Sequence, residues 1–304
     1  LNAKQRDVVD GVTYERILPG RLPPTLDRRL QQQTEELARV AREFRPSVLH
    51  TTTHFVNGLV AREVAKDLGI PWIYEVRGQL ADTWASSRDE SALQSEKYKL
   101  FNAREAEIMR SAGMVATLGE SMKRNIMAVG VAEHKIMITP NAVGGAYLDT
   151  PIKHRDAREA LGLEVNALYI GTVSSLVGYE GLDDLVTAFA LLAPRLPTLG
   201  LILVGDGTAA PGLRDQLQRL GLAGRTIFTG RVSPEQARLY HLALDVFVVP
   251  RKDSAVTRAV TPLKPVEAMA SERPVVASDL EALREIVTDR VNGRLTTPEN
   301  PVRL

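Results

Sequence analysis

The chain has 304 residues, which exceeds the usual size of a single compact core and favours two domains of about 150 residues each. Its 38 Lys and Arg residues balance 37 Asp and Glu, and the net charge of +1 excludes a general electrostatic attraction to nucleic acid or to an anionic membrane. The absence of cysteine excludes disulfides, thiolate catalysis and cysteine metal sites, and no apolar run approaches the ~20 residues that a membrane-spanning helix needs.

The first half of the chain alternates helices with short apolar strands. Residues 26–44 carry apolar side chains at helical spacing, and "PSVLHTTT" then breaks into a run rich in β-branched residues, which predicts a strand. The pattern continues with helices at 56–68, about 90–111 and after Glu120, and with strands at 71–76, 114–118 and 135–139. This alternation indicates a parallel sheet covered by helices on both faces.

The periodicity stops between Pro140 and Asp156, where glycine, proline and polar residues take over. We place the domain boundary in this gap, with one domain over residues 1–143 and a second over residues 144–304. The opening twenty residues have turn and strand-edge character without a complete leading strand and helix. We therefore expect the first domain to be incomplete at its start.

The second domain resumes the alternation and predicts a nearly complete doubly wound α/β sheet. Helices are expected from Leu182, Pro211, Pro234, Leu263 and Glu281, each after a strand. The predicted strands span residues 166–173, 199–207, 225–230, 245–250 and 273–278. Ligands of such sheets bind outside the carboxyl ends of the strands, so the loops that follow these strands are where we seek the chemistry.

The stretch "TPLKPVEAMA" (261–270) predicts an anion site at the start of a helix. Pro262 is tolerated there, and the backbone amides of Leu263 and Lys264 remain as donors that favour phosphate or diphosphate. The Lys264 ammonium adds a point charge, and Glu267, one turn further on, could accept hydrogen bonds from the paired hydroxyls of a ribose. A capped helix with a solvated lysine is the alternative that the residues leave open.

Two glycine loops lie on the same predicted edge. "GTVSSLVGYEG" (171–181) follows a strand and precedes a helix, and its glycines let the backbone approach a ligand closely. It is no P-loop, since no Gly-Lys-Ser/Thr ends it, and "GDGTAAPG" lacks the Rossmann spacing, so NAD and Walker-type ATP sites lose support. "FTGRV" (228–232) places Gly230 after the next strand. Each loop alone is also typical of a plain turn.

Five motifs follow one another in the second half of the chain: "NALYIGTVSSLVGYEGLDDL", "LILVGDG", "IFTGRV", "DVFVVPR" and "TPLKPVEAMASERPVVASD". In this order they resemble the carboxy-terminal domain of family 4 glycosyltransferases with the GT-B fold. "RPSVLHTTTHFVNGLVAREVAKDLGIPWIYEVRG" resembles the later half of the amino-terminal acceptor domain of that fold. The resemblance implies two doubly wound parallel-sheet, Rossmann-like α/β domains that face each other across a cleft. The Gly-rich loop that opens this fold and its final crossing helix are not found, so we expect both ends of the family pattern to be missing.

The resemblance also implies the site residues. Lys264, Glu267 and Arg77 would serve catalysis, with Glu267 holding the ribose and Lys264 facing the diphosphate. The expected donor-binding residues are Gly171, Val173, Ser174, Ser175, Gly205, Gly230, Arg231, Val232, Arg251, Pro262, Leu263, Lys264 and Glu267. The expected residues of the acceptor side are His50, His54, Glu75 and Arg77.

The chain departs from the family pattern in the donor domain. Ala259 stands eight residues before Glu267, where the family often has a second glutamate, so one sugar contact is either missing or supplied by another residue, such as Arg258 or Arg251. Glu180 stands where the family often has the lysine of a Lys-Gly pair. The resemblance then implies that another cation, Lys264, carries that charge.

A further departure lies in the acceptor domain. Arg77 stands where many members have a histidine. "YEVRG" and "TPLKP" are nevertheless similar to a bacterial surface-polysaccharide branch of the family, which makes these features typical of a branch. His50 and His54, spaced i, i+4, lack an HExxH motif and neighbouring carboxylates, so we expect no metal site.

We therefore expect a retaining, metal-independent, hexosyltransferase-like enzyme that uses a nucleotide sugar of the UDP or GDP type as co-substrate and needs no cofactor. Its acceptor would be the hydroxyl of a sugar, a lipid-linked sugar or a small molecule, in polysaccharide, glycolipid or glycoconjugate biosynthesis. We expect a cytoplasmic protein with at most peripheral contact with the inner face of the membrane, and no nucleic-acid partner. A nucleotide-sugar epimerase of the same fold and a non-catalytic nucleotide-sugar-binding protein are the alternatives, the latter suggested by Ala259 and Arg77.

Overall fold

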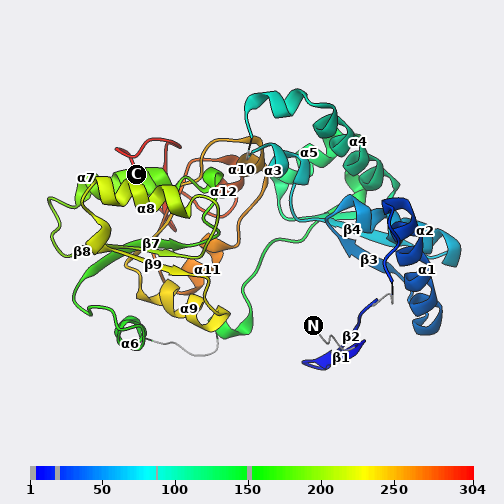
Figure 1. The fold of residues 1–304 in the computed structure, drawn as a ribbon, viewed down its shortest axis with the longest axis horizontal. Helices are drawn as coiled ribbons and strands as arrows, with labels where there is room; N and C mark the ends of the chain where they lie inside the picture. The colour runs from blue at the N-terminus through cyan, green and yellow to red at the C-terminus, as the bar shows by residue number, and fades with distance from the viewer. Residues whose placement is uncertain (1–4, 18–20, 87, 149–152) are drawn as a thin grey trace. The chain divides into compact units, whose positions relative to one another are not determined.

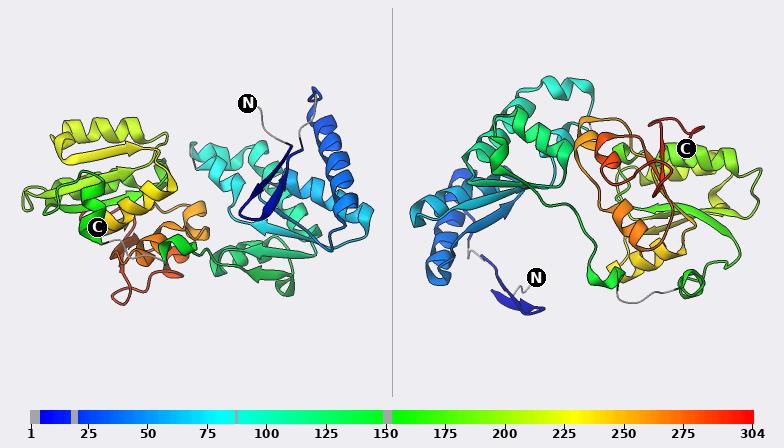
Figure 2. Two further views of the ribbon diagram at one scale, coloured as in Figure 1. Left: turned by 90° about the horizontal axis from the view of Figure 1, so that it is seen from below. Right: turned by 180° about the vertical axis from the view of Figure 1, so that it is seen from behind.

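The computed structural model of the protein describes residues 5–17, 21–86, 88–148 and 153–304 (Figures 1 and 2). Its chain separates into two compact units. The smaller unit comprises residues 1–80, 94–117 and 126–137, and the larger comprises residues 81–93, 118–125 and 138–304. Two short segments of the first half thus pack with the larger unit, while the boundary at 143/144 stays a prediction.

The smaller unit is built on a four-stranded sheet with the order β3-β4-β5-β6, in which β3, β4 and β5 are parallel. Its strands and helices are β1 (Arg6–Val9), β2 (Val12–Glu15), α1 (Leu26–Phe44), β3 (Leu49–Thr52), α2 (Phe55–Leu68), β4 (Trp72–Val76), α4 (Glu96–Ser111), β5 (Met114–Thr117) and β6 (Ile136–Ile138). Two further helices, α3 (Leu80–Ala85) and α5 (Glu120–Ala128), contribute residues to both units. The predicted alternation of the first half is confirmed.

One predicted helix of this half is interrupted. The sequence favoured a continuous helix over about 90–111, whereas the structure has a 3₁₀ turn over Glu90–Gln94 and then α4 from Glu96. Ser95 separates the two, because its hydroxyl accepts a hydrogen bond from the backbone N–H of Tyr98 and so caps α4. Ser95 is a typical N-cap residue, and a prediction based only on the spacing of apolar residues does not take it into account.

The larger unit is built on a six-stranded, all-parallel sheet with the order β12-β11-β10-β7-β8-β9. Its elements are α6 (His154–Ala160), β7 (Leu168–Val173), α7 (Leu182–Leu192), β8 (Leu199–Val204), α8 (Ala210–Arg219), β9 (Thr226–Gly230), α9 (Pro234–Ala243), β10 (Val246–Val249), α10 (Ala255–Ala259), α11 (Lys264–Ala270), β11 (Val275–Ser278), α12 (Glu281–Arg284) and β12 (Arg294–Thr296). The strand order reverses between β7 and β10, which makes their carboxyl ends the topological switch point of the sheet.

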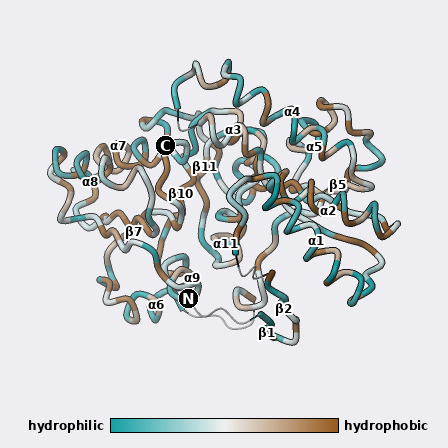
Figure 3. The backbone as a smooth tube through the Cα atoms, turned by 45° about the vertical axis from the view of Figure 1, so that its right-hand side comes forward, coloured by the Kyte–Doolittle hydropathy of each residue, from teal (hydrophilic) through white to brown (hydrophobic). Residues whose placement is uncertain are grey.

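Helices cover both faces of this sheet, with α7 and α8 on one face and α9 and α11 on the other (Figure 1). The central strand β8 shows why both faces are covered. Leu201 and Leu203 pack toward α7 and α8, and the alternate residues Ile202 and Val204 pack into the core of the opposite face. Figure 3 shows apolar stretches in the strands of this unit and polar stretches in its turns. The doubly wound architecture predicted for the second half is confirmed.

A buried arginine anchors the first helix of the larger unit. Arg158 of α6 is 2% exposed, and its guanidinium lies 2.6 Å from the carboxylate of Asp245. The same carboxylate accepts a hydrogen bond from the backbone N–H of Tyr169 at 2.6 Å. Asp245 of the "DVFVVP" motif therefore joins α6 to β7 at the amino end of the sheet.

None of the helices in the described ranges combines the length and the hydropathy of a transmembrane span.

Candidate functional site

A hollow of about 380 Å³ lies at the carboxyl ends of β7 and β8 in the larger unit. Its lining residues are Val173, Ser174, Ser175, Val204, Gly205, Asp206, Arg231, Val232 and Ala237. Six of the predicted donor-binding residues are thus brought together, from the ends of two strands and from the turn after β9. Gly230 ends β9 beside them and pairs with Gly205 in an isolated bridge.

The close approach of the loop after β7 to the end of β8 depends on Gly205. Its φ of +123° lies in a region that side chains rarely adopt, and a Cβ at this position would fall 1.9 Å from the carbonyl oxygen of Ser174. The backbone N–H of Ser174 in turn donates to Val204 at 2.9 Å. The two serines of the loop are therefore held directly over the hollow.

A buried cluster of three charged side chains lies at the switch point, between the connection that follows β7, the end of β10 and the start of α11. Arg251 donates from Nε and Nη2 to the two carboxylate oxygens of Glu180, at 3.3 and 3.2 Å. The Lys264 ammonium lies 2.5 Å from Oε1 of the same carboxylate. The side chains of Glu180, Arg251 and Lys264 are 5%, 8% and 16% exposed. We call these three residues the switch-point cluster.

Gly181 explains how Glu180 reaches Arg251. It has a φ of +68°, and a Cβ there would fall 1.9 Å from the carbonyl oxygen of Pro250. Only glycine lets the start of α7 pass so closely over the residue that follows β10. The Lys-Gly pair of the related family thus becomes a Glu-Gly pair whose carboxylate faces two cations.

The switch-point cluster retains a positive charge. Burial by itself would raise the pKa of the Glu180 carboxyl, but the charges of Lys264 and Arg251 hold it below its ordinary value. Burial lowers the pKa of Lys264 to about 8, and Glu180 opposes that fall. At neutral pH Glu180 and Lys264 are therefore ionised, and together with the guanidinium of Arg251 the two cations and one anion have a net charge of +1. A buried net charge attracts a counter-ion strongly, because little water screens it.

Glu267 lies one turn into α11 and is half-buried. The Tyr147 hydroxyl hydrogen-bonds its carboxylate, and Nε2 of His241 lies 3.7 Å from its Oε2. Burial raises the pKa of Glu267, against the Tyr147 hydrogen bond and the charge of Lys264. Tyr147 and His241 were not predicted, because neither stands in a motif and both reach Glu267 only through the tertiary fold.

The remaining donor-side predictions lie as follows. Gly171 lies inside β7, opposite Ile202 of β8, and before the strand end. Pro262 and Leu263 directly precede α11, and Leu263 is its N-cap. Arg258 was one of the two candidates for the sugar contact missing at Ala259, but its guanidinium pairs with Asp253 at 2.5 Å.

The smaller unit brings three of the four predicted acceptor residues together, one on β3, one on β4 and one directly after β4. The Glu75 carboxylate lies 3.2 Å from Nε2 of His50 and 3.3 Å from Nη1 of Arg77. His54 lies apart from this group. Its Nδ1 accepts a hydrogen bond from the backbone N–H of Val56 and so caps α2, which is a structural role.

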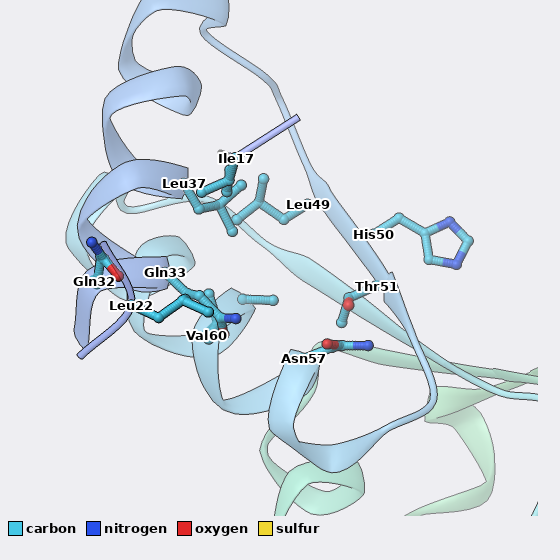
Figure 4. A pocket seen from close by; sticks show the side chains of 11 residues that line it. Ile17, Leu22, Gln32, Gln33, Leu37, Leu49, His50, Thr51, Asn57 and Val60 are labelled. Carbon is cyan, nitrogen blue, oxygen red and sulfur yellow. The ribbon is translucent and has the colours of Figure 1, made fainter. Parts of the chain in front are cut away.

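The smaller unit has a cavity of its own, of about 450 Å³, whose lining is mainly apolar (Figure 4). Leu22, Leu37 and Leu49 gather on one side, and the His50 imidazole points away from them. The lining residues that the structure describes include no lysine or arginine. This cavity therefore lacks the charge that a diphosphate needs.

Within the described ranges no three His, Asp or Glu side chains gather as metal ligands would.

Both parts of the chain match known protein families. Residues 153–304 match the family described as "Glycosyl transferases group 1", and residues 2–142 match the "Glycosyl transferase 4-like domain". Alpha-monoglucosyldiacylglycerol synthase of Streptococcus pneumoniae is 24% identical over 264 residues, which cover 84% of this chain and 57% of that protein. The lipopolysaccharide core biosynthesis mannosyltransferase LpsB of Rhizobium meliloti is 32% identical over 161 residues, which cover 49% of this chain and 43% of that protein. The chain thus spans about half the length of these relatives.

Solved structures share the fold. Sucrose-phosphate synthase from Thermosynechococcus elongatus superposes with a TM-score of 0.77 at 21% identity, over 99% of this chain and 74% of that chain. Anabaena HepE in complex with UDP-glucose superposes with a TM-score of 0.70 at 20% identity, over 88% of this chain and 69% of that chain. These likenesses establish the two-domain architecture of parallel α/β sheets.

Proposed function

The chain belongs to the group 1 glycosyltransferases and has the GT-B fold, and on this premise we propose that it transfers a sugar from a nucleotide diphosphate sugar of the UDP or GDP type to a hydroxyl acceptor. Retention of configuration and independence from metal and cofactor are part of the proposal. The names of several relatives support the chemistry, since they include GDP-mannose-dependent mannosyltransferases and the HepE complex with UDP-glucose.

The observation that carries the proposal is the switch-point cluster. Glu180 replaces a cation of the related family, and Lys264 brings a cation to the same place from the opposite side, 2.5 Å from the Glu180 carboxylate. The exchange keeps a net positive charge at the switch point, beside the hollow that the predicted donor residues line. Lys264 thereby compensates for the departure from the family pattern at Glu180, which favours a working donor site over a non-catalytic protein.

The cluster suits the departure of a diphosphate. In the transfer step, the bond between the anomeric carbon and the diphosphate oxygen breaks, and the acceptor oxygen bonds to the same face of that carbon. Negative charge develops on the diphosphate, and Lys264 and Arg251 would stabilise it from a preorganised position. A phosphate oxygen takes the proton of the acceptor hydroxyl, so no protein base is needed. The products are the glycosylated acceptor and the nucleoside diphosphate.

Glu267 would hold the ribose of the donor. Its half-buried carboxylate follows Lys264 by one helical turn, and two carboxylate oxygens can accept hydrogen bonds from the two ribose hydroxyls. We expect Glu267→Ala to weaken nucleoside diphosphate binding by about 1.5–3 kcal/mol, the range for hydrogen bonds to a charged group. Titration calorimetry measures this loss, and an unchanged affinity in a folded variant would contradict the ribose assignment.

Acceptor and location belong to the same proposal. The names alpha-monoglucosyldiacylglycerol synthase and lipopolysaccharide core biosynthesis mannosyltransferase denote glycolipid products, which supports an acceptor hydroxyl on a sugar or a lipid-linked sugar. Such acceptors are made at membranes, so we propose a cytoplasmic protein at the inner face of the membrane. His50, Glu75 and Arg77 would serve the acceptor side.

One experiment tests the proposed reaction against its alternatives. The protein is incubated with UDP and GDP sugars, with and without glycolipid or sugar acceptors, and the products are analysed by mass spectrometry. A transferase releases nucleoside diphosphate with the acceptor and forms a glycosylated product, an epimerase converts the donor sugar, and a binding protein leaves the donor unchanged. Lys264→Ala should abolish transfer, whereas Lys252→Ala, which removes a lysine paired with Asp183, should retain it.

A further inference from the structure

His241 is a buried polar residue without a hydrogen bond, and the proposed reaction does not use it. Its side chain is 1% exposed, and within the described part of the chain neither ring nitrogen has a hydrogen-bonding partner. An uncompensated buried imidazole costs folding free energy, so its position calls for an explanation. Oε2 of Glu267 lies 3.7 Å from its Nε2, beyond hydrogen-bonding distance.

We propose that His241 and Tyr147 are positioning residues that hold the Glu267 carboxylate from two sides, so that its free lone pairs face a ribose diol. This inference rests on the proposed function, in which Glu267 contacts the ribose of the nucleotide. Tyr147 belongs to the turn that precedes α6, His241 to α9 and Glu267 to α11. Three segments that are distant in sequence thus meet at one carboxylate.

The ring of His241 is fixed in orientation by aromatic neighbours. It stacks on Phe247 of β10 with ring centroids 4.9 Å apart and an interplanar angle of 10°, and Tyr147 meets it edge-on at 6.1 Å. These contacts restrict the plane of the imidazole, whose Nε2 lies 3.7 Å from Oε2 of Glu267. A shift of the carboxylate by less than one ångström would close the 3.7 Å separation to a hydrogen bond of about 2.9 Å.

Tyr147 holds the carboxylate through its hydroxyl, which hydrogen-bonds Glu267. A carboxylate offers about four lone-pair sites. One hydrogen bond from Tyr147 and one from a neutral His241 therefore leave two sites, which matches the two hydroxyls of a ribose. Without these supports the glutamate side chain would have to lose its rotamer freedom on binding the nucleotide, which weakens the interaction.

The charge states agree with this arrangement. Burial lowers the pKa of His241 to about 4, so its imidazole is neutral at neutral pH and can donate from one nitrogen. Two groups lower the pKa of Glu267: Tyr147, through a hydrogen bond, and Lys264 of the same helix, through its charge. The charge of Arg238 of α9 lowers the pKa of Tyr147. Burial raises the pKa of Glu267, and its ionised form is therefore lost as the pH falls through a value above 4.5.

The test compares the affinity for UDP with the affinity for 2′,3′-dideoxy-UDP, or the guanine pair if the protein prefers GDP. The ratio of the two affinities reports the ribose hydroxyls alone. We expect the full chain to prefer the ribonucleotide by about tenfold or more, and Glu267→Ala to abolish this preference. Tyr147→Phe and His241→Phe should each reduce the ratio by about threefold or more while leaving the dideoxynucleotide affinity unchanged.

Controls separate positioning from folding. Tyr240→Phe removes the neighbouring tyrosine hydroxyl of α9 and should leave the ratio unchanged. His241→Gln retains a donor and should keep more of the preference than His241→Phe does. The pH at which the ribose preference is lost should rise in Tyr147→Phe, because the hydrogen bond that favours the ionised carboxylate is gone. An unchanged midpoint in that variant would count against the inference.

The possible outcomes separate the inference from the function on which it rests. If Glu267→Ala removes the ribose preference but Tyr147→Phe and His241→Phe both keep the full ratio, the positioning role is wrong and the ribose role of Glu267 stands. If the unmodified protein shows no preference, or Glu267→Ala retains it, the ribose role fails and the inference fails with it. A reduced ratio in both positioning variants, with dideoxynucleotide affinity intact, supports it.

Discussion

At the scale of single residues, Lys264 illustrates how burial and pairing act together. Its ammonium is 16% exposed and contacts a carboxylate, yet burial lowers its pKa to about 8. The charged form is therefore present below this pH and is lost as the pH rises through it. A lysine with this pKa can still stabilise a diphosphate at neutral pH, where it carries its proton.

We predict that the affinity for UDP falls as the pH rises from 7 to 8.8, because Lys264 loses its charge over this range. Uridine carries the same base without phosphate, and its affinity over the same range corrects for ionisation of the base. In Lys264→Ala the affinity for UDP should be lower at pH 7 and nearly independent of pH. Calorimetric titrations at several pH values measure both effects, and an equal pH dependence in the variant would show that another group titrates.

Arg77 gives a prediction on the acceptor side. It lies at the end of β4, about half exposed, and its guanidinium pairs with Glu75 at 3.3 Å. Lysine can keep a salt bridge with Glu75 but cannot reproduce the planar fork that holds a carboxylate or phosphate with two bonds. We predict that Arg77→Lys folds, binds nucleotide normally and loses transfer by at least about tenfold, ~1.4 kcal/mol.

The control for Arg77→Lys is Arg42→Lys, which changes another exposed, paired arginine of the smaller unit. Steady-state kinetics with donor and acceptor should find this control fully active. Full activity in Arg77→Lys as well would contradict a role of the Arg77 guanidinium in transfer.

At the scale of elements, the proposed donor site lies where connections cross the ends of neighbouring strands. The loop after β7 passes over β8 at Gly205, and the start of α7 passes over the end of β10 at Gly181. These two close approaches bring together side chains from the segments that follow β7 and β10 and from the start of α11 at the switch point. Where the strand order of a parallel sheet reverses, the adjacent connections pass to opposite faces of the sheet and leave a crevice at the carboxyl ends of the strands.

We predict strong energetic coupling between Glu180 and Lys264. Glu180→Lys alone places three cations together, and Lys264→Glu alone places two carboxylates against one arginine, so each should destabilise the larger unit by about 3–5 kcal/mol. The double variant restores opposite charges and should recover at least about 2 kcal/mol of that loss. Urea unfolding of the four proteins measures the coupling.

The matched control exchanges Arg155 and Glu159, an exposed pair one turn apart on α6. Water screens this pair, so little coupling is expected there. If the exchange of Glu180 and Lys264 recovered no more stability than this surface exchange, the switch-point cluster would not act as a buried ion-pair network.

At the scale of the whole molecule, the balanced charge matters because it concentrates attraction for anions at one place. With a net charge of +1 over 304 residues, the protein has no general basic surface. The proposed nucleotide binding would therefore depend on local groups of the larger unit, which holds the switch-point cluster, Glu267 and the hollow at the ends of β7 and β8.

We predict that UDP protects the larger unit in hydrogen exchange. At a concentration of about 100 times its dissociation constant, a ligand adds about 2.7 kcal/mol to the stability of the unit that binds it, or about 100-fold slower exchange at amides that open by global unfolding. Peptides from β7, β8 and β10 should show this protection, whereas α1 and α2 should not. Glu267→Ala should weaken it, and equal protection of α1 and α2 would contradict a donor site confined to the larger unit.

The sequence by itself determined the architecture and the edge of the sheet where the site lies. Apolar periodicity and the placement of proline and glycine are local properties, so they predict strands such as 166–173 and helices such as the one that begins at Pro234 without knowledge of distant contacts. The carboxyl-end rule for parallel sheets then directed attention to Ser174, Gly205 and Arg231, which line one hollow. The assignment of these residues to a sugar donor followed from the resemblance of the short motifs to a known family, and it stays a prediction.

Only the tertiary structure decided which charges meet. Glu180 looked like the loss of a cation and Lys264 like a solvated or phosphate-facing lysine, because a sequence records neither the distance between them nor their burial. Tyr147 and His241 carried no signal at all, since each touches Glu267 across segments that are far apart in the chain. Side chains from distant segments meet through the packing of helices on the sheet, and that packing depends on the shape of the whole core.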